Sequence, residues 1–129
     1  MLAESLKYKL EDIARIAHET NKSYCELIGD KSQTDWFSAP EWQRKSAMSG
    51  VLFHLDSLTK GQKPEPSASH NVWLAEKEAE GWKFGPIKNP ELREHPEFVP
   101  YSQLPIEQKM KDYLFCAVVE AFYTAYLNE

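Results

Sequence analysis

The 129-residue sequence lacks the features that mark three large classes of protein. It has no apolar run near the roughly 20 residues that a membrane-spanning helix needs. It has no cluster of Lys and Arg and a formal net charge of −5, so it is poorly suited to contacting the phosphates of nucleic acid. It has only two cysteines, Cys25 and Cys116, too few for a disulfide framework. We therefore expect no membrane and no nucleic-acid partner, and two buried, reduced thiols.

The sequence also lacks the short motifs of common active sites and metal centres. It has no GxSxG, P-loop or GxGxxG pattern, and none of its four histidines has a partner at a recognised metal spacing. His18 and His54 lie near apolar helix faces, where we expect satisfied core residues, and His95 precedes Pro96 in an expected turn. We predict a protein that is not an enzyme, with no cofactor and no metal site.

What is present indicates one globular domain over residues 1–129. The hydrophobic fraction is 42% and the aromatic fraction 12%, values typical of folded proteins rather than disordered ones. The first residues carry charge from Glu4 onward, unlike a signal peptide. We therefore expect a cytoplasmic protein with one core.

The first half of the chain is expected to form two helices. Apolar residues at helical spacing predict a helix over about 4–28 that ends at Gly29. Trp36 and Phe37, in the following connection, are expected to tuck back over the core. Ser38 is the expected N-cap of the second helix, with Pro40 in its first turn and Glu41 completing a capping box. The residues expected on its buried side are Trp42, Ala47, Val51, Leu52 and Leu55.

One lane of the second helix is small and polar. Ser46, Gly50 and His54 recur every four residues, so they share one face. Two interpretations stay open: the lane lets another backbone approach closely, or it faces a solvent-filled groove.

The second half is expected to form two more helices and a small ribbon. Residues 58–68 are rich in Gly, Pro, Ser and Lys and are predicted to be an exposed loop. Ser69 caps a short third helix that ends at Gly81, and Leu104-Pro105 open the last helix. Aromatic residues predict two short strands over 82–84 and 98–101, joined by a proline-rich segment that limits the ribbon to an edge-type pairing. The fold class is mainly α with a small β-ribbon, about four helices in antiparallel pairs.

Many fixed aromatic, glycine and proline spacings resemble those of the RyR domain, the module repeated in ryanodine receptor calcium channels and also found alone in bacterial and phage proteins. The residues that carry this resemblance are His70, Trp73, Lys77, Gly81-Trp82, Phe84-Gly85-Pro86, His95-Pro96, Val99-Pro100-Tyr101 and Leu104-Pro105. Upstream residues resemble the longer, stand-alone bacterial form, namely Ile13-Ala14-Arg15, His18, Tyr24-Cys25, Glu41-Trp42-Gln43-Arg44 and Phe53-His54-Leu55. The resemblance covers about 8–127. Phe84 departs from it, since the family usually has Tyr there, and so does Glu97-Phe98, where Cys-Leu is common.

The resemblance implies antiparallel helices with short strands and no catalysis. In the channels these modules are peripheral cytoplasmic domains. The stand-alone bacterial forms have been proposed to sense nucleotide-derived ligands. The resemblance thus implies a non-catalytic ligand-binding or sensory module for a small anionic, nucleotide-like molecule. The alternative is a protein–protein interaction or structural module without a small-molecule ligand, and the oligomeric state is open.

The candidate ligand-binding surface is the aromatic ribbon beside the third helix. Concave sites combine apolar walls with a few polar anchors, and this segment supplies both. Its candidate residues are Trp73, Lys77, Trp82, Lys83, Phe84, Arg93 and Tyr101. The competing interpretation is that Trp73 and Trp82 are core posts that hold the ribbon to the helices.

Overall fold

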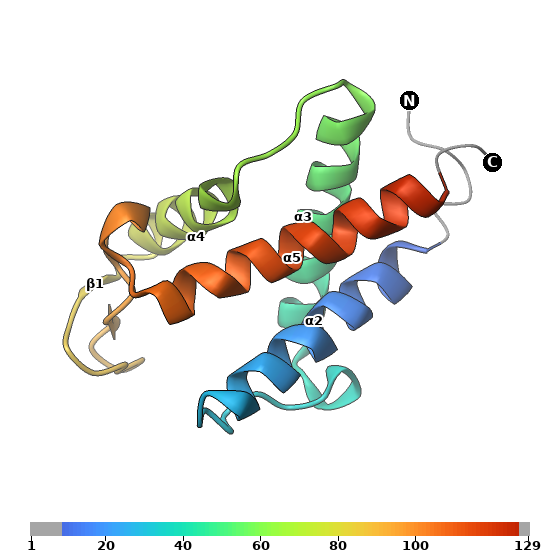
Figure 1. Ribbon diagram of the computed structural model, residues 1–129. Coiled ribbons are helices and arrows are strands. Elements are labelled where there is room, and N and C mark those ends of the chain that lie inside the picture. The colour runs from blue at the N-terminus through green and yellow to red at the C-terminus, as the bar shows by residue number, and fades with distance from the viewer. Residues whose placement is uncertain (1–8, 127–129) are drawn as a thin grey trace. The chain divides into compact units, whose positions relative to one another are not determined.

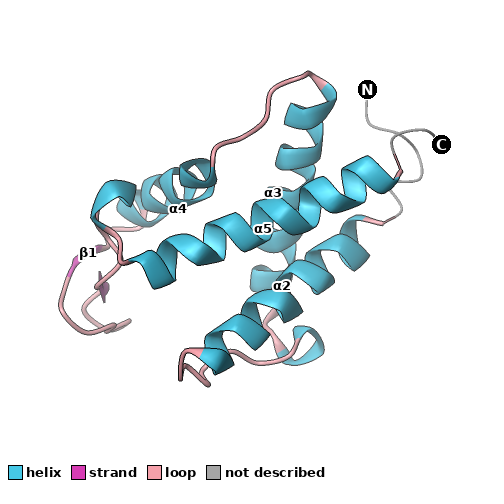
Figure 2. Ribbon diagram, in the orientation of Figure 1, coloured by secondary structure: helices cyan, strands magenta, loops and turns pink. Residues whose placement is uncertain are grey.

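The computed structural model describes residues 9–126 and is mainly helical, as expected (Figures 1 and 2). The described part holds four α-helices and one small sheet. In chain order the elements are α2 (Leu10–Leu27), the 3-10 helix η1 (Trp36–Ser38), α3 (Glu41–Thr59), α4 (Pro66–Ala79), β1 (Lys83–Phe84), β2 (Glu94–His95), the 3-10 helix η2 (Tyr101–Gln103) and α5 (Ile106–Ala125). The expected start of the first helix, near residue 4, lies outside the described residues. None of the helices in residues 9–126 is both long and apolar enough to cross a membrane.

The chain divides into two compact units. Unit 1 comprises the chain up to Pro64 and from Tyr113 onward, and unit 2 is Glu65–Asp112. The predicted single domain over 1–129 stays a prediction.

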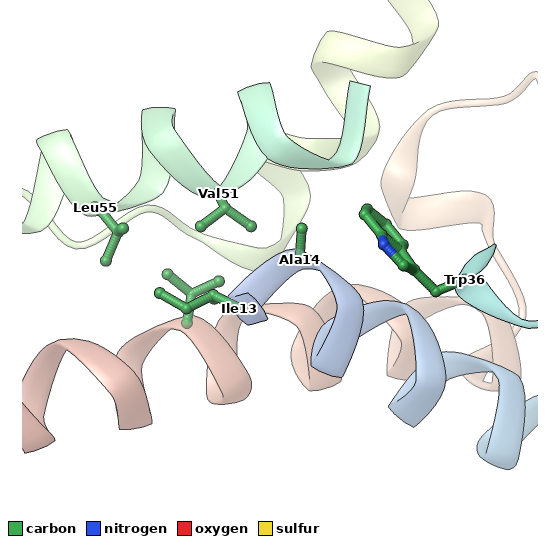
Figure 3. Close-up of a cluster of buried hydrophobic side chains, with 6 residues drawn as sticks. Ile13, Ala14, Trp36, Val51 and Leu55 are labelled. Atoms are coloured by element: carbon green, nitrogen blue, oxygen red, sulfur yellow. The ribbon is translucent and has the colours of Figure 1, made fainter. Parts of the chain in front are cut away.

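The core of unit 1 is built from α2, η1, α3 and α5. Its fully buried members are Ile13, Ala14, Trp36, Val51, Leu55 and Val119 (Figure 3). Burial of an Ile, Leu or Val side chain stabilises a fold by about 1.5–3 kcal/mol. Two residues expected on the buried side of the second helix are exposed instead: Trp42 is 68% exposed in the first turn of α3, and Leu52 is 39% exposed. Leu27, the last residue of α2, is 86% exposed.

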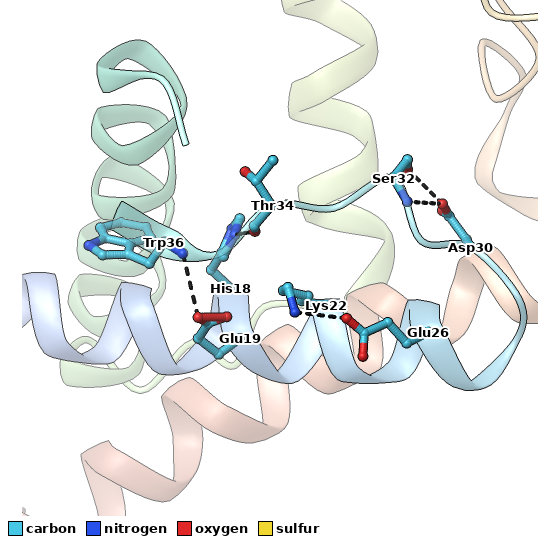
Figure 4. Close-up of polar contacts among 8 residues, drawn as sticks. All are labelled: His18, Glu19, Lys22, Glu26, Asp30, Ser32, Thr34 and Trp36. Carbon is cyan, nitrogen blue, oxygen red and sulfur yellow. Dashed lines mark hydrogen bonds and ion pairs between the residues drawn. The ribbon is translucent and has the colours of Figure 1, made fainter. Parts of the chain in front are cut away.

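The connection from α2 to α3 is fastened to α2. The His18 Nε2–H group donates to the Thr34 carbonyl at 2.7 Å, and the Trp36 N–H lies 3.5 Å from Glu19 Oε1 (Figure 4). Trp36 is 1% exposed, whereas Phe37 is 78% exposed, so only one ring of the expected pair covers the core. His18 is hydrogen-bonded, as expected, but it is only half-buried and therefore lies at the edge of the core.

The predicted cap of the second helix was wrong. Ser38 is the last residue of η1, and its N–H group donates to Asp35 Oδ1 at 2.8 Å. The helix begins two residues after Ala39, at Glu41, with Pro40 at the N-cap position and no side-chain cap hydrogen bond. Because Ser38 belongs to the 3-10 helix and lies two residues before the N-cap position, it cannot cap α3.

Three helices end with the same backbone arrangement. Gly29, Gly61 and Gly81 follow α2, α3 and α4, and their φ angles are +91°, +75° and +87°. In each, the N–H of the residue after the glycine reaches five residues back, as from Asp30 to the Cys25 carbonyl at 2.8 Å. This is the Schellman motif, which favours glycine because its backbone is left-handed there. The end of α3 and its Schellman motif therefore occupy the first part of the predicted 58–68 loop. Helix α4 begins at Pro66 rather than after Ser69.

The small sheet differs from the predicted ribbon. β1 lies close to the expected 82–84, but its partner is Glu94–His95, in parallel register with Lys83 opposite Glu94 and Phe84 opposite His95. The predicted strand 98–101 is absent from the described structure, and η2 begins there at Tyr101. Pro96 and Pro100 have no N–H group to donate to a ladder, so the pairing stops before them.

Helix α5 begins at Ile106, directly after the predicted Leu104-Pro105 start. Its buried residues are Cys116 and Val119. Met110 and Tyr113 lie on the outer side of this helix, at 38% and 55% exposure.

Candidate functional site: the ring cluster of unit 2

Unit 2 gathers six aromatic rings, which we call the ring cluster: His70, Trp73, Trp82, His95, Phe98 and Tyr101. Trp73, on α4, is the ring with most neighbours. It stacks on His70 at 5.6 Å between ring centroids and meets His95 edge-on at 5.0 Å. Phe98 contacts it at 6.2 Å. Trp73 thus links α4 to β2 and to the chain that follows it by ring contacts.

Two histidines tie α4 to the chain after the sheet. The Nε2–H group of the buried His70 donates to the Val99 carbonyl at 2.7 Å. The Glu97 N–H group donates to His95 Nδ1 at 3.0 Å, which requires that nitrogen to be unprotonated. Burial lowers the pKa of His95, in agreement with this bond. The turn predicted at His95 is confirmed, whereas the bond made by His70 could not be read from the sequence.

Two of the candidate residues, Trp82 and Lys77, lie close together. The Lys77 Nζ lies 5.5 Å from the centroid of the Trp82 ring, within the range of a cation–π contact. Lys77 also pairs with Glu80 at 3.7 Å. Trp82 is half-buried, and its ring lies 6.3 Å from that of His95. One end of the ring cluster therefore combines an accessible indole with an ammonium group.

The other candidate residues are spread around the unit. Lys83 is exposed and pairs with Glu94 at 3.9 Å, and Phe84 is 56% exposed on the sheet. The Arg93 guanidinium donates to the Glu80 carbonyl at the end of α4. Arg93 is thus held by the helix end, which gives it a structural role. Tyr101 contacts His70 at 6.1 Å, on the other side of the cluster, and Lys109 Nζ lies 5.5 Å from its ring centroid.

Sequence reasoning missed a further group close to His70 of the ring cluster, the carboxyl group of Asp112. Burial raises the pKa of Asp112 to about 6 from the ordinary 3.8, while the nearby charge of His70 acts in the opposite direction. Asp112 stands in a polar stretch of α5, QKMKD, that carries no sign of burial in the sequence.

Replacing Asp112 by Asn should stabilise the protein only at higher pH. The folded state binds the Asp112 proton more tightly than the unfolded chain does, so unfolding free energy falls as pH rises from about 4 through 6. Asn stays neutral throughout. We expect Asp112→Asn to gain about 1 kcal/mol near pH 8, allowing for partial solvation, and nothing near pH 4. Thermal denaturation at both pH values checks this, with the exposed Glu91→Gln as control; an equal gain at both would contradict it.

Metal-ligating groups lie elsewhere. Among the described residues, a set whose side chains could hold one ion together is His54, Cys116 and Glu120, all in unit 1. The ring cluster and the side chains near it offer rings, an ammonium group and one partly buried carboxyl.

Fold and ring cluster together define a small helical module whose rings hold a two-stranded sheet against a helix. The family model of the RyR domain matches residues 65–121. This segment is therefore a RyR domain, as the resemblance predicted, and the match starts where unit 2 starts. The wider resemblance over 8–127 stays a prediction. No curated protein matches the chain.

Proposed function

We propose that the RyR domain of this chain is a non-catalytic module that binds a small anionic, nucleotide-like ligand at Trp82 and Lys77. The observation that carries the proposal is the Lys77 ammonium group 5.5 Å from the centroid of a half-buried indole. A planar base stacks on an aromatic face. An ammonium group binds phosphate as a point charge.

The charge of unit 2 limits the size of that ligand. Residues 65–112 contain six Lys and Arg against nine Asp and Glu, a net charge of −3. A long polyanion would be repelled by the unit as a whole. The phosphate of a mononucleotide needs only the positive charges of Lys77 and of Lys83 on β1. The proposal is therefore restricted to small ligands.

Thermal denaturation with mononucleotides and cyclic nucleotides tests the proposal. A ligand at a hundred times its Kd should stabilise the folded protein by about 2.7 kcal/mol. Lys77→Gln should weaken binding about tenfold, because a hydrogen bond to a charged group contributes about 1.5–3 kcal/mol. Lys31→Gln, an exposed lysine of unit 1, is the control and should bind normally. No shift at millimolar concentration of any of these ligands would remove the support for a nucleotide-like ligand.

A second candidate function, a protein-interaction module that self-associates, is favoured by a different observation. Three large apolar side chains of the sheet and its loop are exposed: Phe84 at 56%, Ile87 at 76% and Leu92 at 61%. Such side chains, when contiguous, mark interaction surfaces. Sedimentation of the whole chain separates the two candidates, since a strict monomer at high concentration would leave the second without support.

A further inference from the structure

Helices α3 and α5 bring three metal-ligating side chains together within unit 1. His54 lies on α3, and Cys116 and Glu120 lie four residues apart on one face of α5. One ligand atom from each, an imidazole nitrogen, the sulfur and a carboxylate oxygen, lies within 4.8 Å of the others. The two helices are in contact one turn earlier on α3, where a Cβ atom at Gly50 would stand 3.6 Å from Phe115 Cζ of α5.

His54 is the observation that distinguishes this group from ordinary core packing. Its side chain is 2% exposed, yet its Nε2 atom makes no hydrogen bond within residues 9–126. The closest carboxylate oxygen, Glu120 Oε2, is 3.5 Å away, an ion-pair distance rather than a hydrogen bond. A buried ring nitrogen without a bond costs about 1–3 kcal/mol. The expectation that His54 is a satisfied core residue was therefore wrong in this respect.

We propose that His54, Cys116 and Glu120 form a site for a divalent transition metal ion of the zinc class. Zinc prefers these three ligand types and binds them at about 2.0–2.3 Å, which places tetrahedral neighbours about 3.3–3.8 Å apart. The pair of His54 Nε2 and Glu120 Oε2 is already in that range at 3.5 Å. The sulfur of Cys116 lies within 4.8 Å of the His54 nitrogen and the Glu120 oxygen of this set. Three protein ligands leave a fourth position for water or an exogenous ligand.

One further contact fixes the orientation of the Glu120 carboxylate. Lys63 pairs with the other carboxylate oxygen, Glu120 Oε1, at 3.2 Å and is exposed. That pairing orients the carboxylate and leaves Oε2 for the ion, as outer contacts of metal ligands commonly do. The site shares no residue with the ring cluster, and its proposal does not depend on the proposed ligand of unit 2.

Cobalt(II) titration of the purified full chain, kept reduced, tests the site. Wild-type protein should show the thiolate-to-cobalt charge-transfer absorption, and zinc(II) should displace it. Cys116→Ser should abolish the absorption, whereas Cys25→Ser, which alters the other buried cysteine, should retain it. Absence of the absorption in wild type, or its survival in Cys116→Ser, would overturn the proposal.

A second variant guards against loss of folding. Glu120 is only partly buried, at 26% side-chain exposure, so Glu120→Gln should fold. It should weaken zinc(II) binding, measured against a chelating indicator, by at least about tenfold, since losing even an outer contact of a metal ligand costs about 10–100-fold. Glu26→Gln, an exposed acid of α2, should bind zinc(II) as wild type does. Equal affinities for all three proteins would refute the assignment.

Discussion

Replacing Trp36 by alanine is expected to remove about 3–5 kcal/mol of unfolding free energy, the largest effect of any single substitution considered for unit 1. Trp36 is 1% exposed and packs with Ile13, Ala14 and Val51 between α2 and α3 (Figure 3). Truncation leaves a cavity that the two helices cannot fill without moving. Since small proteins have about 5–15 kcal/mol of stability in total, the variant should melt at a temperature lower by about 10 °C or more.

The neighbouring residue supplies the matched control. Phe37 is 78% exposed, so Phe37→Ala should change the unfolding free energy by less than about 0.5–1 kcal/mol. Trp36→Phe should lose clearly less than Trp36→Ala, because a ring remains and a buried indole N–H that makes no hydrogen bond within the described residues is removed. Urea titration of the three variants measures the order. Similar losses for Trp36→Ala and Phe37→Ala would contradict the observed burial.

The second large effect is expected in unit 2, at Gly85. A Cβ atom at this position would stand 2.5 Å from the Cβ of Glu94, across the small parallel sheet. The Gly85 N–H group also donates to the His95 carbonyl at 3.3 Å, so the strands cannot separate without losing that bond. Gly85→Ala should therefore destabilise the protein by about 1–3 kcal/mol, the usual cost of overpacking.

Gly50→Ala is the control with the opposite sign. The nearest atom to its added Cβ is Phe115 Cζ at an ordinary 3.6 Å, and alanine in the middle of a helix is more stable than glycine by about 0.5–1 kcal/mol. Chemical denaturation should show a loss for Gly85→Ala and a small gain or no change for Gly50→Ala. A gain for both would mean that the strands do not approach closely at Gly85.

Local signals in the sequence predicted much of the fold. The glycines at 29 and 81 ended helices as expected, because a left-handed residue after a helix depends on its neighbours alone. The proline before Ile106 marked the start of α5 correctly. The partner of β1 was misplaced, because two-residue strands carry too little pattern to reveal their register. Ser38 was assigned to the wrong element, since an N-cap and a 3-10 turn use the same residue types.

The sites were predictable only where the residues are close in sequence. Lys77 and Trp82 are five positions apart, and their contact follows from the helix end at Gly81. His54 and Glu120 are 66 positions apart, so no spacing rule could associate them. Arg93 looked like a free cation in the sequence, but its guanidinium is used by the end of α4.

In the three helices that end at a glycine, the position of the helix end and the strength of packing depend on different residues. Each stop, at Gly29, Gly61 or Gly81, is made by backbone groups of a few consecutive residues. Changes to distant core side chains therefore alter how firmly a helix is held but not where it ends or in which direction the chain leaves it. Substitutions of apolar residues in α2, α3 or α4 are therefore expected to leave the path of the connecting segments unchanged.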